Sequence, residues 1–116
     1  MDLDHAIAAH VQWKTKFRSA ITSQQTLDAA TIGKDNCCEL GQWLHGAGRS
    51  GHGGRPEFVS LLEKHKSFHK EAGFVATMIN NKKLDEASKM IDAGTPFTAA
   101  SNAVGVAINA LKKAIA

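Results

Sequence analysis

The fold is decided by residues 56–79, PEFVSLLEKHKSFHKEAGFVATMI. Pro56 suits the first position of a helix, because the N–H that proline lacks would have no partner there. From Phe58 to Ile79 the apolar and histidine positions recur at steps of four and three residues, which is the period of one buried helical stripe. The stripe consists of Phe58, Leu62, His65, His69, Ala72, Ala76 and Ile79. The sequence therefore predicts a long helix whose central buried positions are two histidines.

Two further stretches have the same period. The first runs from Asp2 to about Ser23, with the stripe Leu3, Ile7, His10, Trp13 or Lys14, Phe17 and Ile21. The second follows Asn81, with the stripe Met90, Ala93, Phe97, Ala100, Val104, Ala107, Leu111 and Ala114. Because this last stripe keeps its phase across residues 94–96, we expect one long helix kinked at Pro96 rather than two helices.

The connecting segments carry weaker patterns. Residues 26–36 mix Asp, Thr, Gly and Asn without periodicity, which indicates a loop. Residues 38–45 are typical of a short helix that ends at Gly46, and the glycine-rich residues 46–54 indicate irregular structure. The sequence thus predicts an all-α four-helix bundle of three long helices and a short cysteine-bearing helix, in a single domain of residues 1–116.

Length and composition support this interpretation. The 116 residues suffice for one core, and the absence of Tyr and the scatter of β-branched residues argue against a sheet. The formal net charge of +3 is small and dispersed, so we expect no nucleic-acid partner. The N-terminus lacks the pattern of a signal peptide, and no apolar run reaches the roughly 18 residues of a membrane span. We therefore expect a cytoplasmic protein.

His65 and His69 lie one helical turn apart on the same face, a spacing that lets two imidazoles reach one metal ion. An isolated pair could equally be two core histidines, each bonded to a carbonyl. Two observations favour a metal site. Burial of an imidazole costs free energy unless its polar atoms find partners. A third histidine, His10, also occupies an equivalent stripe position on another long helix.

A cysteine can supply the fourth ligand, since thiolates bind zinc strongly and Cys38 lies on the short segment between the ligand-bearing helices. The adjacent Cys37 is the alternative, and neighbouring cysteines do not close a disulfide of ordinary geometry. Three histidines and one cysteine would fill the four positions of zinc and leave none open for catalysis. Lys66 stands where a His-Glu-x-x-His protease has its general base, and the stripes lack the carboxylates of a di-iron bundle. We expect no enzyme.

Three motifs together carry a resemblance: AHVQW (residues 9–13), CELGQW (residues 38–43) and HKSFH (residues 65–69). In order and spacing they resemble the chemoreceptor zinc-binding domain of bacteria. Alignment of the Leu-Gly-x-Trp element places Cys38, rather than Cys37, in the ligand position. The resemblance implies a cytosolic helical bundle that binds zinc through three histidines and one cysteine. It also implies homodimers and a place beside chemotaxis-receptor or diguanylate cyclase domains, or alone.

The resemblance further implies a sensory role in which the site reports zinc availability, or oxidants such as hypochlorous acid that attack Cys38. Zinc would keep this thiol deprotonated and nucleophilic, and oxidation would weaken its ligation. One alternative is a zinc-stabilised interaction or dimerisation module without a sensing role. Another is an interaction module whose histidines only pack.

Overall fold

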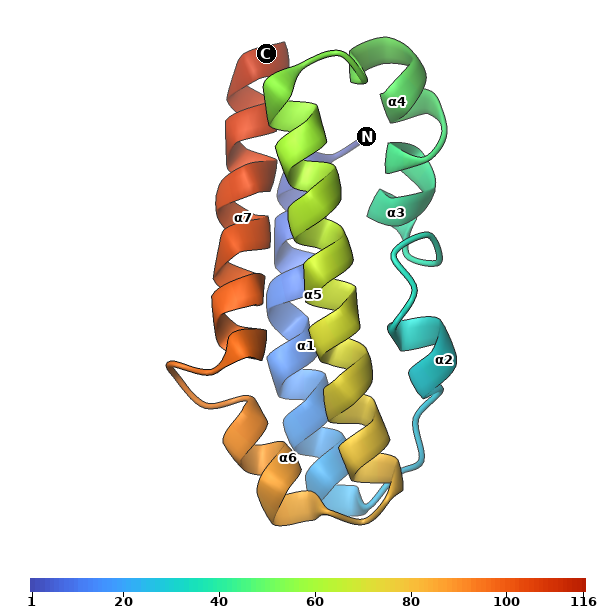
Figure 1. Cartoon of the computed structure of the whole chain (residues 1–116), viewed down its shortest axis with the longest axis vertical. Helices are drawn as coiled ribbons and strands as arrows, with labels where there is room; N and C mark the ends of the chain where they lie inside the picture. The colour runs from blue at the N-terminus through green and yellow to red at the C-terminus, as the bar shows by residue number, and fades with distance from the viewer.

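The computed structural model describes residues 1–116, which fold as helices without a strand. Three long helices run side by side: α1 (Leu3–Ser23), α5 (Pro56–Asn80) and α7 (Pro96–Ile115) (Figure 1). As predicted, α5 begins at Pro56. Helix α1 begins after Asp2, whose carboxylate accepts a hydrogen bond from the backbone N–H of His5. Such caps satisfy helical N–H groups that have no partner within the helix.

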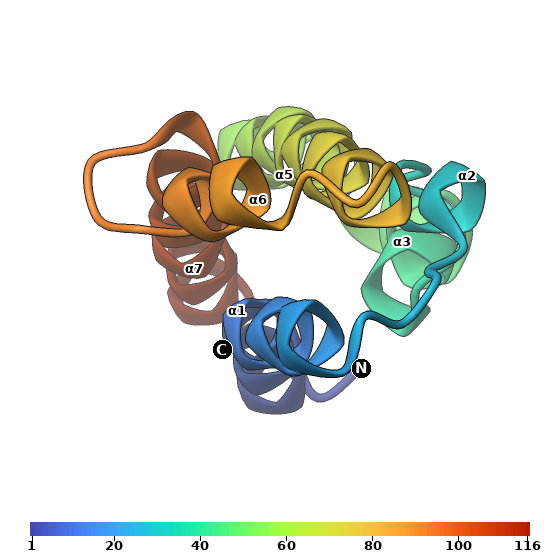
Figure 2. The same ribbon diagram turned by 90° about the horizontal axis from the view of Figure 1, so that it is seen from below.

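The fourth corner of the bundle is made of short pieces. Helices α2 (Ala29–Ile32), α3 (Glu39–Leu44) and α4 (Ala47–His52) follow one another along the side of the bundle. Seen end-on, α1, α5 and α7 occupy three corners, and α2 and α3 occupy the fourth (Figure 2). The all-α prediction is confirmed, and so is the short helix at residues 38–45, with Cys38 as its N-cap.

Two segments that the sequence indicated to be irregular contain helices, so those expectations are wrong. Helix α2 begins after Asp28, whose carboxylate accepts from the backbone N–H of Thr31. Helix α4 forms in the glycine-rich stretch, and its Gly48 allows close packing. A Cβ atom on Gly48 would lie 2.6 Å from the ring of Trp43. Tertiary contact here outweighs the low helix propensity of glycine.

The expectation of one last helix kinked at Pro96 is also wrong. The segment contains two helices, α6 (Leu84–Met90) and α7, which are joined by residues 91–95. Within this connection Gly94 adopts a φ of 81°, a left-handed conformation that a continuous α-helix does not contain. The hydroxyl of Thr95 donates to the carbonyl of Met90 and accepts from the backbone N–H of Thr98, so it closes the turn and caps α7. Pro96 therefore starts a helix instead of bending one.

The core lies where the long helices meet, and the predicted α5 stripe is confirmed except at Leu62, which is only partly buried. The sequence missed a second row on the same helix, made of Leu61, Phe68 and Val75. Among polar residues, the buried ones are His10, His65 and His69. These three buried imidazoles are therefore the feature of the core that needs a chemical explanation.

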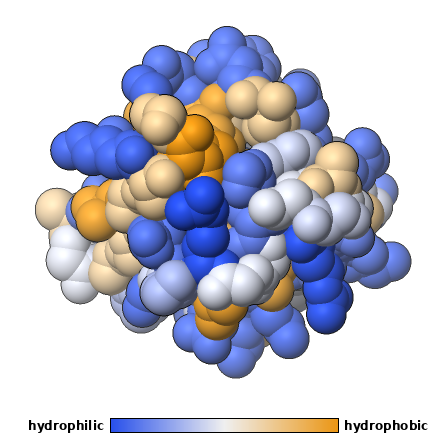
Figure 3. Space-filling model, turned by 90° about the horizontal axis from the view of Figure 1, so that it is seen from above, coloured by the Kyte–Doolittle hydropathy of each residue, from blue (hydrophilic) through white to orange (hydrophobic).

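The two ends of the chain meet at one end of the bundle, where Lys112 pairs with Asp4 at 2.7 Å. In Figure 3, which looks onto this end, apolar side chains form small patches among hydrophilic ones. No helix is long and apolar enough to cross a lipid bilayer.

Candidate metal centre

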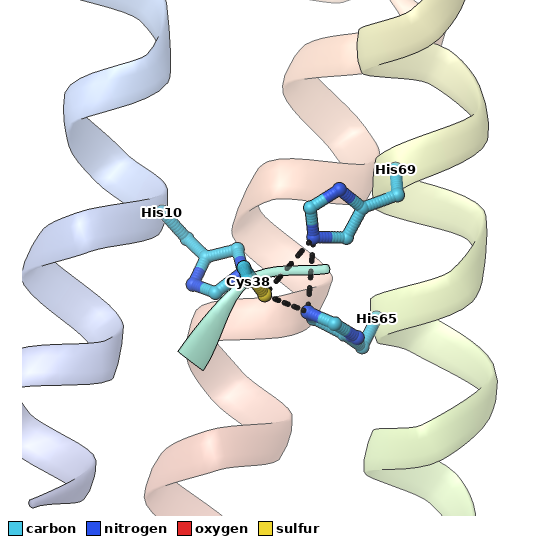
Figure 4. Close-up of side chains that lie close together, drawn as sticks. All are labelled: His10, Cys38, His65 and His69. Carbon is cyan, nitrogen blue, oxygen red and sulfur yellow. Dashed lines mark hydrogen bonds between the residues drawn. The ribbon is translucent and has the colours of Figure 1, made fainter. Parts of the chain in front are cut away.

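The structure brings together the four residues that the sequence singled out. His10 lies on α1, His65 and His69 lie on α5, and Cys38 lies at the start of α3. Each offers one donor atom, and these four atoms lie within 4.8 Å of one another. Figure 4 shows the side chains converging from three directions. The three histidines are almost inaccessible to solvent, with exposed fractions of 4%, 0% and 2%.

The spacing of the donor atoms suits one tetrahedral ion. The Sγ atom of Cys38 lies 3.2 Å from Nε2 of His65, 3.5 Å from Nε2 of His69 and 4.0 Å from Nε2 of His10. The two Nε2 atoms of His65 and His69 are 3.0 Å apart. Tetrahedral zinc separates two nitrogen ligands by about 3.3 Å, and a nitrogen from a sulfur by about 3.6 Å. The donor atoms of Cys38, His65 and His69 therefore have nearly the spacing of zinc ligands, and no separation in the group of four exceeds 4.8 Å.

Backbone carbonyls determine which nitrogens face the cluster. A carbonyl only accepts, so Nδ1–H of His10 donates to Ala6 and Nδ1–H of His69 donates to Ile32, both at 2.8 Å. In a neutral imidazole the other nitrogen, Nε2, then has a free lone pair. The Nε2 atoms of both residues point to the same place. Two imidazole lone pairs that face the sulfur of Cys38 are a set of donor atoms that a zinc ion takes.

The protonation states also favour metal binding. Burial, together with the neighbouring His69 and His10, lowers the pKa of His65 to about 2. Burial likewise lowers the pKa of His10 and of His69, although the carbonyls of Ala6 and Ile32 oppose the shift. All three imidazoles are therefore neutral at neutral pH, which is the form that binds a metal ion.

Cys38 caps helix α3, because its Sγ accepts a hydrogen bond from the backbone N–H of Gly41 at 3.3 Å. Burial raises the pKa of the Cys38 thiol, and the hydrogen bond from Gly41 opposes this shift. Without a cation the thiol would therefore keep its proton at neutral pH. A bound metal would remove that proton, as coordinating thiols are deprotonated outright.

The sequence model of the chemoreceptor zinc-binding domain family matches residues 10–76, more than half of the chain, and this range contains all four clustered residues. The chain belongs to this family. Zn²⁺ is thus the cofactor of the domain, as expected from the sequence. No curated protein and no solved structure matches the chain.

Cys37, the alternative ligand in the sequence, and His45 lie outside the cluster of this chemoreceptor zinc-binding domain. Cys37 is exposed and lines a groove of about 1170 Å³ between α2 and α5, together with Lys66 and Lys70. His45 pairs with Asp35, with 3.0 Å between its Nε2 and the carboxylate. Neither side chain belongs to the group of donor atoms, although both neighbour it along the chain.

The domain also contains site neighbours that sequence reasoning missed. The ring of Phe68 packs against His10 and His69, with centroids 5.1 and 5.3 Å away. Trp43, in the CELGQW motif, packs on Gly48 and Phe58. Phe68 could have been found from its place three residues after His65, on the second buried row. The carbonyls of Ala6 and Ile32, which accept from His10 and His69, are backbone groups, so no side-chain pattern predicts them.

Proposed function

We propose that this domain is a sensory or regulatory module of bacterial signalling in which His10, Cys38, His65 and His69 hold one zinc ion. The single observation that supports the proposal most strongly is the convergence of four donor atoms within 4.8 Å, from histidines that burial keeps neutral. Zinc would supply positive charge that neutralises the thiolate and joins α1, α3 and α5. The module acts in the cytoplasm, as a homodimer, and has no catalytic role.

Four protein ligands fill the usual coordination of zinc, so the closed site regulates rather than activates water. The ligands come from two long helices and from the start of a short one. His10 and the two histidines of α5 sit on rigid elements, whereas Cys38 is the last of the non-helical residues 33–38. The cysteine is therefore the ligand that can leave with the least disturbance of the bundle.

Cys38 is the proposed redox-reactive residue. Its thiolate attacks the chlorine of hypochlorous acid, the O–Cl bond breaks and hydroxide leaves. Hydrolysis of the S–Cl bond then gives a sulfenic acid, chloride and a proton that neutralises the hydroxide. Sulfur loses two electrons and the oxidant gains them. The oxidised sulfur is a poorer ligand than the thiolate, and Cys38 also caps α3. Oxidation would thus loosen both the site and the start of that helix.

Elemental analysis tests zinc binding. Protein purified without added metal is expected to contain about one zinc per chain. The double variant His65→Ala/His69→Ala should lose this zinc, while His5→Ala serves as a matched control because His5 is exposed. Full zinc occupancy in the double variant would overturn the ligand assignment.

Controlled oxidation tests sensing. One equivalent of hypochlorous acid should release zinc from the wild type, as followed with a chromogenic chelator, and a thiol reductant should restore binding. The variant Cys37→Ser should respond like the wild type, since Cys37 lies outside the cluster. Zinc that stays bound, without sulfenic acid at Cys38, would favour the alternative of a zinc-stabilised interaction or dimerisation module that senses nothing.

The domain would pass its signal to an output domain. A chemotaxis-receptor signalling domain or a diguanylate cyclase, in the same protein or in another chain, would read the state of the domain. Sedimentation of the zinc-loaded and zinc-free forms tests the proposed homodimer. A monomer in both forms at high micromolar concentration would contradict it.

A further inference from the structure

The three histidines differ in what orients their rings. Nδ1–H of His10 donates to Ala6, four residues earlier on the same helix, so α1 orients this ring by itself. Nδ1 of His65 has no hydrogen-bond partner. Nδ1–H of His69 donates to the carbonyl of Ile32, which is the last residue of α2. His69 is therefore oriented by an element other than its own helix.

Helix α2 reaches this position because two glycines let its backbone touch that of α5. A Cβ atom on Gly73 would lie 2.9 Å from Cα of Gly33 and 3.5 Å from its nitrogen. Gly33 directly follows Ile32, the residue whose carbonyl bonds His69. The distance between the two helices at the level of His69 is thus set by the absence of a side chain on Gly73.

The other end of the same segment is fixed as well. The side-chain amide of Asn80 accepts from the backbone N–H of Leu27 and donates to its carbonyl, both at 2.7 Å. Residues 27–33 are therefore held on α5 at both ends, and the chain continues from Gly33 to Cys38. Because Asn80 holds Leu27 in place, a displacement of α2 at Gly33 would move Ile32, the residue before it.

We infer that Gly73 is a positioning residue for the zinc site. The missing side chain seats α2 on α5, which brings the Ile32 carbonyl to Nδ1 of His69 and leaves Nε2 of that ring free for the metal. This inference rests on the proposed ligand set and adds α2 as an element that controls zinc affinity. Displacement of α2 from α5 acts on His69 directly and on Cys38 through the intervening chain.

The variant Gly73→Ala tests the inference. We expect zinc to bind about tenfold more weakly in a competition titration, which is the usual effect of losing the partner that orients a ligand. Alanine favours a helix more than glycine does, so the metal-free variant should keep its fold, as checked by circular dichroism and urea unfolding. The matched control is Gly105→Ala on α7, where a Cβ atom would meet nothing within 4 Å and zinc affinity should not change.

A merely structural role would not alter the tautomer of His69, so this is the second readout. Long-range ¹H–¹⁵N correlation spectra of the metal-free protein should show His69 protonated at Nδ1 in the wild type and in Gly105→Ala. In Gly73→Ala the protonation should be divided between Nδ1 and Nε2. If that variant does not fold, Gly33→Ala provides the test, because its Cβ would approach Ala29 only to 3.3 Å and should give a smaller shift in the same direction.

The inference would be overturned if folded Gly73→Ala kept both the zinc affinity and the His69 tautomer of the wild type. It would also be overturned if Gly105→Ala weakened zinc binding as much as Gly73→Ala does. The ligand assignment has a separate test. If His69→Ala binds zinc as tightly as the wild type, the assignment itself is wrong, whereas loss of zinc in His69→Ala with a normal Gly73→Ala refutes only the role of α2.

Discussion

Lowering the pH from about 7 to about 6 is expected to weaken zinc binding about tenfold, or about 1.4 kcal/mol, because binding releases one proton per chain. Burial lowers the pKa of His10, His65 and His69, that of His65 to about 2, so these rings have fewer protons to lose than ordinary histidines have. Burial raises the pKa of Cys38, so this thiol carries the one proton that zinc displaces. Three histidines of ordinary pKa would together release about two further protons at a pH of about 6.

Calorimetry distinguishes the release of one proton from the release of about three. Zinc titrations at a pH of about 6 in buffers of different ionisation enthalpy give the number of protons released per ion bound. We expect about one proton for the wild type and none for Cys38→Ser, whose hydroxyl stays protonated and which should bind zinc more weakly. Release of about three protons by the wild type would refute the reasoning, because it would mean that the histidines are charged before zinc binds.

Three further outcomes are expected. The metal-free protein should lose stability below pH 6.5, by about 1.4 kcal/mol per pH unit from His65 alone. The pKa of His65 is about 2 in the folded state and about 6.5 in the unfolded state, so between these values only the unfolded state binds the proton. Urea unfolding at stepped pH measures this slope, and a flat profile would contradict it. Phe68→Ala should cost about 3–5 kcal/mol in urea unfolding, whereas Phe74→Ala, at 49% exposure, should cost less than about 1 kcal/mol. Gly41→Ala would place a Cβ atom against the carbonyl oxygen of Asp35, so it should displace the chain before Cys38. Zinc binding should then weaken at least about tenfold in a competition titration. Wild-type zinc affinity in this variant would show that the close contact between Gly41 and Asp35 is not needed.

The parts of the fold that follow one periodic stripe could be predicted from the sequence. Helices α1 and α5 bury a face every three or four residues, and their caps are local: Asp2 and Pro56 stand directly before or at the first turn. The ligands could be found for the same reason. Two histidines one turn apart and His10 on another stripe are polar residues where apolar ones would pack better.

The remaining elements depend on contacts between distant segments. Helix α4 forms despite its glycines because Gly48 fits against Trp43, which no local propensity reveals. The break before α7 was hidden because the stripe resumes in phase after Gly94, although that residue has a left-handed backbone. The carbonyl of Ile32 orients His69 across a distance of 37 residues in sequence, and a backbone group has no identity that a side-chain pattern could show.

X-ray absorption spectroscopy at the zinc edge tests the central claim most directly. The zinc-loaded protein should show a first shell of three nitrogen scatterers and one sulfur scatterer, and Cys38→Ser should lose the sulfur while Cys37→Ser keeps it. A shell without sulfur, or one that keeps its sulfur in Cys38→Ser, would contradict a site made by His10, Cys38, His65 and His69.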